Sequence, residues 1–378
     1  MTATPTGPAL STPPDNAEHL LAPATAHQAL RMLLSSAPTA SAIAVGLHHN
    51  GQRALFVRGR TAHHGGVPAD ARTRFEIGSL TKTFTALLLA EQAARGELNL
   101  GDPLARHLPA GTLLPPGGRA MTLTHLATHT SGLPRLPPGL LRSAVPRLFT
   151  NPYAVFGTDD VFHALARTRL RATPGTRVRY SNFGAGLLGH VLTGAAGSHS
   201  YPALLDVRVL KPLGLQDTSC TAAAPEGGTQ VTGYWRRRAR PPFHIPGLPA
   251  AGALRSSADD MLTLTEALLA PASVKVPTAL ETALRDVPRP RLRLPRGSSL
   301  ALIWNIHSRR DGSLLYHHSG GTRGCTAFAG FVPHHGTALV ALANTAPGTD
   351  NNLIQAAYNT LIALQPRNTR RRQGQSRK

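Results

Sequence analysis

Three short motifs bring together side chains that could act as a nucleophile, a base and a proton donor. Ser79-Leu80-Thr81-Lys82 places a hydroxyl three residues before an amine, Tyr180-Ser181-Asn182 joins a phenol to an amide, and His318-Ser319-Gly320 carries an imidazole. Residues i and i+3 share one face of a helix, so the amine of Lys82 can reach the hydroxyl of Ser79. This spacing is compatible with attack of a serine oxygen on a carbonyl carbon.

The helix that must position Lys82 is the most apolar stretch of the chain. Residues 79–95 contain no Gly or Pro, and leucine and phenylalanine side chains surround most of the circumference. This pattern predicts a buried central helix that ends at Gly96. Lys82 is one of only four lysines, and burial beside apolar residues favours its neutral, basic form. The Ser-x-x-Lys spacing alone is a weak signal that favours a solvent-exposed helix start. The scarcity of lysine in the chain and the apolar setting of Lys82 favour the catalytic interpretation instead.

Taken together, the motifs make the chain resemble the β-lactamase-related serine hydrolases. These include class C β-lactamases, D-alanyl-D-alanine carboxypeptidases, D-amino-acid peptidases and family VIII-type esterases. The resemblance extends over about residues 38–364. It is carried by the lead-in at 75–78, the segment at 98–104, the "HLLTHTSGLP"-like segment at 123–134, the Pro-Gly-Thr at 174–176, the "PLGM"-like turn at 211–215, and the stretches at 251–254 and 259–261.

The resemblance implies a catalytic role for three positions. Ser79 would be the acylated nucleophile, and Lys82 and Tyr180 would share its proton, with Tyr180 also protonating the leaving group. A phenol beside a cationic amine is expected to have a lowered pKa. The backbone N–H groups of Ser79 and Gly321 would form the oxyanion hole, in which one donor contributes on the order of 3 kcal/mol.

The resemblance also implies substrate-binding positions. Asn182 would hydrogen-bond Lys82 and a substrate amide, and His318, Ser319 and Gly320 would lie on a strand along the opposite wall. His318 stands where typical class C β-lactamases have lysine, which makes efficient β-lactam hydrolysis less expected. Arg323 either binds a substrate carboxylate or is one of the many surface arginines.

The order of apolar segments predicts an α+β fold. Runs at 41–47 and 52–57 flank Asn50-Gly51, a strong hairpin signal, and further strands are expected at 314–318, 326–332 and 337–343. We expect one antiparallel sheet from both ends of the chain, flanked by helices, with a mostly helical region at about 102–290 inserted. A flexible leader (1–24), a single domain (25–365) and a basic disordered tail (366–378) complete the predicted organisation.

No cofactor and no metal site are predicted. Residues 184–189 satisfy Gly-x-Gly-x-x-Gly, but the βαβ context of a dinucleotide site is missing, so close packing is the preferred interpretation. His125 and His129 have helical metal-ligand spacing without a third ligand, and we expect them to form structural hydrogen bonds. The two cysteines, Cys220 and Cys325, are expected to be reduced thiols.

The net charge is +21, almost all of it from arginine, with concentrations at 236–240 and 367–378. This composition predicts non-specific attraction to anionic surfaces, without a motif for specific nucleic-acid binding. The sequence contains no run of eighteen apolar residues, so no transmembrane segment is predicted. Because the first residues do not resemble a secretory signal, the protein is expected to be cytoplasmic. The sequence does not indicate an oligomeric state.

Three functions remain open on these grounds. The first is an acyl-serine hydrolase acting on a small molecule or short peptide, of the D-alanyl-D-alanine carboxypeptidase or esterase kind. The second is a class C-like β-lactamase. The third is a non-catalytic member of the fold that binds a ligand or partner, against which the three intact motifs argue.

Overall fold

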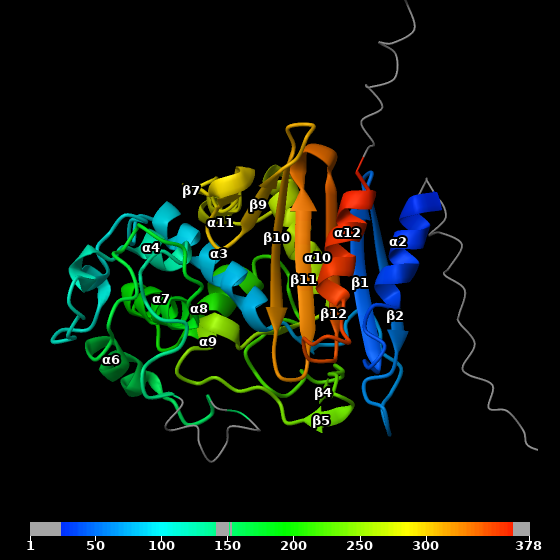
Figure 1. The fold of residues 1–378 in the computed structure, drawn as a ribbon, viewed down its shortest axis with the longest axis horizontal. Coiled ribbons are helices and arrows are strands. Elements are labelled where there is room, and N and C mark those ends of the chain that lie inside the picture. Colours follow the sequence, from blue (N-terminus) through cyan, green and yellow to red (C-terminus); the bar gives the residue numbers. More distant parts are fainter. Residues whose placement is uncertain (1–23, 141–150, 152, 366–378) are drawn as a thin grey trace, which may run out of the picture.

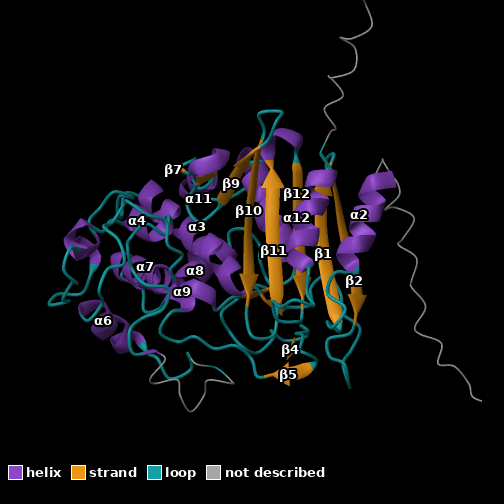
Figure 2. Ribbon diagram, viewed as in Figure 1, coloured by secondary structure: helices purple, strands orange, loops and turns teal. Residues whose placement is uncertain are grey.

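The fold is organised by an eight-stranded sheet in which every neighbouring pair is antiparallel. A computed structural model of the chain describes residues 24–140, 151 and 153–365. The order is β2-β1-β12-β11-β10-β9-β8-β7 (Figures 1 and 2). The strands are β1 (Ala42–His49), β2 (Gln52–Gly59), β7 (Leu292–Arg293), β8 (Ser298–Leu300), β9 (Asn305–Ser308), β10 (Leu314–Gly321), β11 (Thr326–Val332) and β12 (Thr337–Ala343).

Pairing of β1 with β12 confirms that the sheet is built from both ends of the chain. Ile43 lies opposite Ala343 in this pair. The predicted β1–β2 hairpin is also confirmed, and its two turn residues, Asn50 and Gly51, have φ of 52° and 74°. Positive φ at both positions is the signature of the tight hairpin turn that Asn-Gly favours.

Helices cover both faces of the sheet (Figure 2). On one face lie α2 (Ala24–Leu34) and α12 (Leu353–Ala363), and a hydrophobic cluster that includes Leu33, Phe328 and Leu361 packs between them and the sheet. On the other face α10 (Ala258–Leu269) contacts β1, β11 and β12. The larger core cluster continues from there into the helical region.

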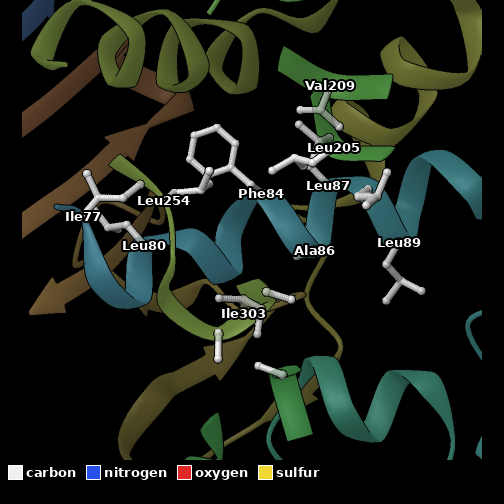
Figure 3. Packing of buried hydrophobic residues seen from close by; sticks show 14 of the residues in the cluster. Ile77, Leu80, Phe84, Ala86, Leu87, Leu89, Leu205, Val209, Leu254 and Ile303 are labelled. Carbon is white, nitrogen blue, oxygen red and sulfur yellow. The ribbon is translucent and has the colours of Figure 1, made fainter. Parts of the chain in front are cut away.

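The predicted central helix is α3 (Thr81–Ala94), and its side chains are buried on nearly all sides. Figure 3 shows Phe84 and Leu87 of this helix beside Leu205 and Val209, in the middle of the larger cluster. Gly96 follows the helix with φ of +76°, as expected for the residue that ends it. The start differs from the prediction, because Ser79 lies in a 3₁₀ turn, Gly78–Leu80, that precedes the α-helix.

The described helical region also contains α4 (Leu123–Ala127), α6 (Thr158–Ala166), α7 (Asn182–Ala195), α8 (Tyr201–Leu205), α9 (Pro249–Gly252) and α11 (Thr278–Asp286). Of these, α7, α8, α9 and α11 contact α3, and α4 packs against α7. Glycines of the Gly-x-Gly-x-x-Gly segment lie inside α7, where a Cβ on Gly186 would come within 2.2 Å of Leu248 and one on Gly189 within 2.3 Å of Ala250. Close packing therefore accounts for this motif.

Two short strand pairs interrupt the helical region, and the sequence did not predict them. β3 (Phe75–Glu76) pairs with β6 (Arg255–Ser256), and β4 (Gly233–Trp235) pairs with β5 (Arg238–Arg240). Strands of two or three residues show no detectable alternation, which explains why they were missed. The predicted leader, except Ala24, and the predicted tail lie outside the described residues. No helix among the described residues is long and apolar enough to cross a membrane.

Candidate active site

Ser79, Lys82 and Tyr180 meet at one point of the structure. Nζ of Lys82 lies 3.0 Å from Oγ of Ser79, and the hydroxyl of Tyr180 donates a 2.5 Å hydrogen bond to the same oxygen. Lys82 and Ser79 come from consecutive turns at the start of α3, whereas Tyr180 directly precedes the residue that caps α7. The structure thus brings together the three residues that the resemblance assigned to catalysis.

The amine of Lys82 is fully enclosed. Its side chain is 0% exposed, and Nζ donates a second hydrogen bond of 2.6 Å to the carbonyl oxygen of Ala251. Burial, and to a lesser extent the charge of Arg135, holds the pKa of Lys82 well below its ordinary value. A neutral amine with one N–H directed to Ala251 keeps its lone pair free to accept the proton of Ser79.

The expected lowered pKa of Tyr180 is wrong. Burial raises the pKa of Tyr180 above its ordinary value, and the hydrogen bond to Ser79 and the charge of Arg135 offset only part of this effect. The prediction assumed a cationic amine beside the phenol, whereas the buried Lys82 favours its neutral form. Tyr180 therefore holds its proton at neutral pH and can serve as the acid of the site.

The third motif lies on β10, which runs past the 3₁₀ turn that carries Ser79. A Cβ on Gly320 would lie 1.9 Å from the carbonyl oxygen of Ile77 and 3.0 Å from the backbone nitrogen of Ser79. Only a glycine permits this approach. A Cβ on Gly78 would lie 2.6 Å from the carbonyl oxygen of Gly321, at the end of the strand, so Gly321 lies against the turn that carries Ser79.

His318 lies in the wall of the site with its side chain buried. Burial lowers the pKa of His318 well below its ordinary value, and neighbouring Lys82 adds to this effect. The imidazole is therefore neutral at physiological pH. Its Nδ1 is buried without a hydrogen-bond partner in the structure.

Asn182 does not hydrogen-bond Lys82 as expected, because both bonds of the amine go to Ser79 and Ala251. Oδ1 of Asn182 is buried and has no hydrogen-bond partner. The amide side chain instead interacts with Tyr153, whose pKa is raised mainly by burial and moderated by this hydrogen bond. An amide oxygen without a partner fits a site that receives an N–H donor from a ligand.

Two cavities meet at Ser79, Gly321 and Arg135. The first has a volume of 480 Å³ and is lined by residues that include Tyr180, His318, Ser319 and Gly320. The second, of 340 Å³, is lined by residues that include Tyr153, Asn182, Phe243 and Arg323. Among the described residues that line either cavity there is no carboxylate.

Two further side chains lie beside the ring of Tyr180: Arg135, which sequence reasoning missed, and His129, which it expected to be structural. The guanidinium carbon of Arg135 lies 5.6 Å from the ring centroid of Tyr180, in cation–π range. The ring of His129 packs 4.6 Å from the same centroid, and burial lowers the pKa of His129 to about 3. His129 was expected to be structural, and its Nδ1 does accept a bond from Ser181 N. The sequence offered one signal for both residues, because His129 lies within the 123–134 segment and Arg135 directly follows that segment.

A buried ion pair supports the floor of the site. Glu76 accepts 2.6 Å hydrogen bonds from the backbone N–H of Phe243 and from Oγ1 of Thr322, and Nη2 of Arg255 lies 3.5 Å from the same carboxylate. Phe243 lines the second cavity and Thr322 follows Gly321. The carboxylate therefore ties together three segments around the nucleophile.

Comparison with known proteins shows the family to which this fold and site belong. The beta-lactamase family matches the chain over residues 31–364. A beta-lactamase from Pseudomonas fluorescens is 27% identical over 352 residues, which are 85% of this chain and 93% of that protein. A crystal structure of a class C beta lactamase from Rhodobacter sphaeroides superposes with a TM-score of 0.72 and 25% identity, covering 89% of this chain and 98% of that one.

A shorter match has higher identity. The D-alanyl-D-alanine-carboxypeptidase/endopeptidase AmpH of Escherichia coli K12 is 35% identical over 172 residues. These residues make up 45% of this chain and 43% of AmpH, so the chain matches less than half of that relative's length. Similar proteins therefore include both a peptidase and β-lactamases.

Proposed function

Because the chain belongs to the beta-lactamase family, whose members are serine hydrolases that act through an acyl-enzyme, we propose that it forms an acyl-enzyme on Ser79. The substrate that we propose is a D-amino-acid peptide of the D-alanyl-D-alanine type, or an ester of similar shape. The observation that carries this proposal is the convergence of Lys82 Nζ and the Tyr180 hydroxyl on Oγ of Ser79, at 3.0 and 2.5 Å.

Acylation begins with transfer of the Ser79 proton to the neutral amine of Lys82, as Oγ attacks the carbonyl carbon. The backbone N–H groups of Ser79 and Gly321 stabilise the negative charge that develops on the carbonyl oxygen. Tyr180 then donates its phenolic proton to the leaving amine or alcohol and recovers a proton from the Lys82 ammonium. Departure of the leaving group produces the ester of Ser79.

Deacylation reverses these roles with water in place of the leaving group. The neutral amine of Lys82 removes a proton from the water, which attacks the ester carbonyl. Collapse of the second oxyanion returns the proton to Oγ of Ser79 and releases the acid. Another nucleophile in place of water would make the same chemistry an acyl transfer.

The charge of the cavities supports a substrate that carries a carboxylate. Arg135 lines both cavities and Arg323 lines the second, and neither forms an ion pair with another described residue. Two guanidinium groups in a cleft without a lining carboxylate favour an anionic ligand. This feature favours a peptide with a free carboxylate over a neutral ester.

The alternative within the family is a class C-like β-lactamase. It is less favoured because His318, where lysine is typical, is buried and neutral and so supplies no fixed positive charge. The alternative outside catalysis is a ligand-binding member of the fold, in which the same cavities would hold a ligand without turning it over.

A side-by-side substrate panel separates these possibilities. Wild-type protein and Ser79→Ala are incubated with an N-acylated D-Ala-D-Ala peptide, a p-nitrophenyl ester and nitrocefin. Release of D-alanine by the wild type, at a kcat/KM above that for nitrocefin, supports the proposal. Faster nitrocefin turnover would favour the β-lactamase, and absence of turnover on all three substrates with a folded protein would favour the binding protein. Cell fractionation would test the cytoplasmic location that the sequence predicts.

A further inference from the structure

The β4–β5 hairpin exposes an aromatic side chain surrounded by arginines. Trp235 is 45% exposed, and Arg236, Arg237 and Arg238 beside it are also exposed. Arg236 stacks over the indole, with its guanidinium carbon 5.4 Å from the ring centroid. None of the three arginines forms an ion pair with any residue that the structure describes. The hairpin therefore presents unneutralised positive charge and apolar surface together.

The hairpin is held rigidly by the residue before the tryptophan. The backbone N–H of Tyr234 donates to the carbonyl oxygens of Gly324 and Asn344, and its hydroxyl accepts a 2.9 Å bond from the N–H of His63. The Tyr234 side chain is buried, so alternation along the strand directs Trp235 to solvent. In Figure 1 the hairpin projects from the lower edge of the molecule.

The two turn residues have an unfavourable backbone conformation for arginine. Arg236 and Arg237 have φ of 49° and 61°. The β1–β2 hairpin has the same turn geometry and fills it with Asn50-Gly51, the sequence that such turns favour. Arginine at both positions costs conformational energy that Asn-Gly would avoid, which points to a role for the side chains.

A second exposed apolar residue lies at the same end of the molecule. Val67 is 49% exposed. The backbone of Thr61 links the two segments, because its N–H donates to Val67 O and its carbonyl accepts from Thr232 N. Trp235 and Val67 thus lie on two segments joined through Thr61, and each segment exposes one large apolar side chain.

We propose that this hairpin docks the protein on an anionic phospholipid surface, with the indole of Trp235 in the headgroup region and Arg236, Arg237 and Arg238 on lipid phosphates. Tryptophan partitions to membrane interfaces, and clustered arginines are attracted to anionic leaflets. A soluble polyanion would engage the charges but leave Val67 without a partner. Because Tyr234 bonds Gly324, next to Arg323 of the second cavity, docking places the catalytic cleft close to the lipid surface.

The intrinsic fluorescence of the full-length protein tests insertion. The chain has two tryptophans, and Trp304 is fully buried, so a change in emission on adding vesicles reports Trp235. With phosphatidylcholine vesicles containing phosphatidylglycerol we expect a blue shift and quenching by brominated acyl chains. Pure phosphatidylcholine vesicles should give neither. The basic tail at 366–378 can attract the protein electrostatically, but it cannot move Trp235 into lipid.

Two variants separate the hairpin from general positive charge. Arg236→Asn combined with Arg237→Gly installs the sequence of the β1–β2 turn, so this double variant should fold and should bind anionic vesicles about 30-fold more weakly in co-sedimentation. Arg167→Gln combined with Arg169→Gln removes the same charge from exposed sites elsewhere and should bind within about threefold of wild type.

Three results would overturn the proposal. The first is binding without a change in Trp235 emission, which would indicate attraction through the tail. The second is equal weakening by the two double variants, which would indicate general charge. The third is a blue shift of the same size with heparin or DNA as with anionic vesicles, which would indicate a soluble polyanion as the ligand.

Discussion

Oγ1 of Thr322 donates a 2.6 Å hydrogen bond to Oε2 of Glu76, and this contact joins the strand before the nucleophile to the turn after β10. Glu76 lies three residues before Ser79, and Thr322 directly follows Gly321. Oγ1 of Thr322 also accepts bonds from the N–H groups of Gly324 and Cys325. The two backbone donors proposed for the oxyanion hole are therefore positioned by one buried side-chain contact.

Loss of this contact should slow the chemical step more than binding. In Thr322→Val the hydroxyl is absent, so Gly321 is held less firmly, and we expect kcat to fall about 10-fold or more, short of the 10²–10³ seen when an oxyanion donor is deleted. Thr322→Ser keeps the hydroxyl and should stay close to wild type. Steady-state kinetics on the preferred substrate measure the split between kcat and KM; equal kcat for the Val and Ser variants would contradict this role.

Activity should depend on the neutral form of Lys82. Burial holds the pKa of Lys82 well below its ordinary value, so the neutral base is available at a lower pH than for an exposed lysine and is lost as the pH falls through that pKa. The pH profile of kcat/KM should therefore show an acidic limb. Lys82→Arg, which cannot lose its proton, should abolish acylation across the profile. An acylation rate in Lys82→Arg near that of wild type would contradict the assignment.

Burial of the Lys82 amine should also lower the free energy of unfolding. Unfolded lysine binds a proton up to about pH 10.4, whereas the folded state releases it at lower pH, so this residue makes stability rise with pH between the two pKa values. Lys82→Met removes the penalty and should be about 1–2 kcal/mol more stable than wild type at pH 7. Thermal denaturation at pH 7 and pH 10 measures the difference, which should shrink at the higher pH.

Arg135 should affect both the binding of a substrate carboxylate and the pKa of Lys82. It lines both cavities and contributes to the lowered pKa of Lys82. In Arg135→Gln we expect KM to rise about 10-fold for a peptide with a free carboxylate, and much less for its amide. The acidic limb should move to higher pH because a neighbouring positive charge is lost. The same rise of KM for both peptides would exclude recognition of the carboxylate by this residue.

Asp260, a buried carboxyl away from the nucleophile, should make the free energy of unfolding depend on pH. Burial raises the pKa of Asp260 to about 6 from 3.8, so the folded state binds the extra proton and stability is lost as the pH rises through this window. Asp260→Asn keeps an acceptor for Thr218 and Asp217 N–H, which donate to Asp260 now. It should be about 1–3 kcal/mol more stable than wild type at pH 8 and nearly equal at pH 4.

The exposed Asp350 provides the control for that comparison. Asp350→Asn changes an exposed side chain and should have little effect on the unfolding free energy. A pH-independent effect of Asp260→Asn would show that its charge state does not differ between the folded and unfolded protein.

Much of the framework could be predicted from local signals. Asn50-Gly51 between apolar runs located a hairpin, and the all-round apolar pattern of 79–95 located the buried helix, because both signals depend on neighbours in the sequence. The α+β sheet from both termini followed from the order of those elements and is confirmed by the Ile43–Ala343 pairing. The convergence of Ser79, Lys82 and Tyr180 was expected from three linked motifs.

The electrostatic details of the site could not be predicted in this way. The raised pKa of Tyr180 depends on how deeply α3 and α7 bury the phenol, and the interaction of Asn182 with Tyr153 in place of Lys82 depends on side-chain directions. Arg135 reaches Tyr180 only through the folded loop that follows Ser131. Such contacts join residues about 30 or more positions apart, and no local pattern in the sequence records them.

The central claim is that Ser79 is the residue acylated during turnover. Intact-protein and peptide mass spectrometry after reaction with a fluorophosphonate, and in parallel with a penicillin, tests it most directly. We predict one adduct per chain on Ser79 in the wild type, with no adduct in folded Ser79→Ala or Lys82→Ala. An unlabelled wild-type protein, or an adduct on another residue that persists in Ser79→Ala, would contradict the account.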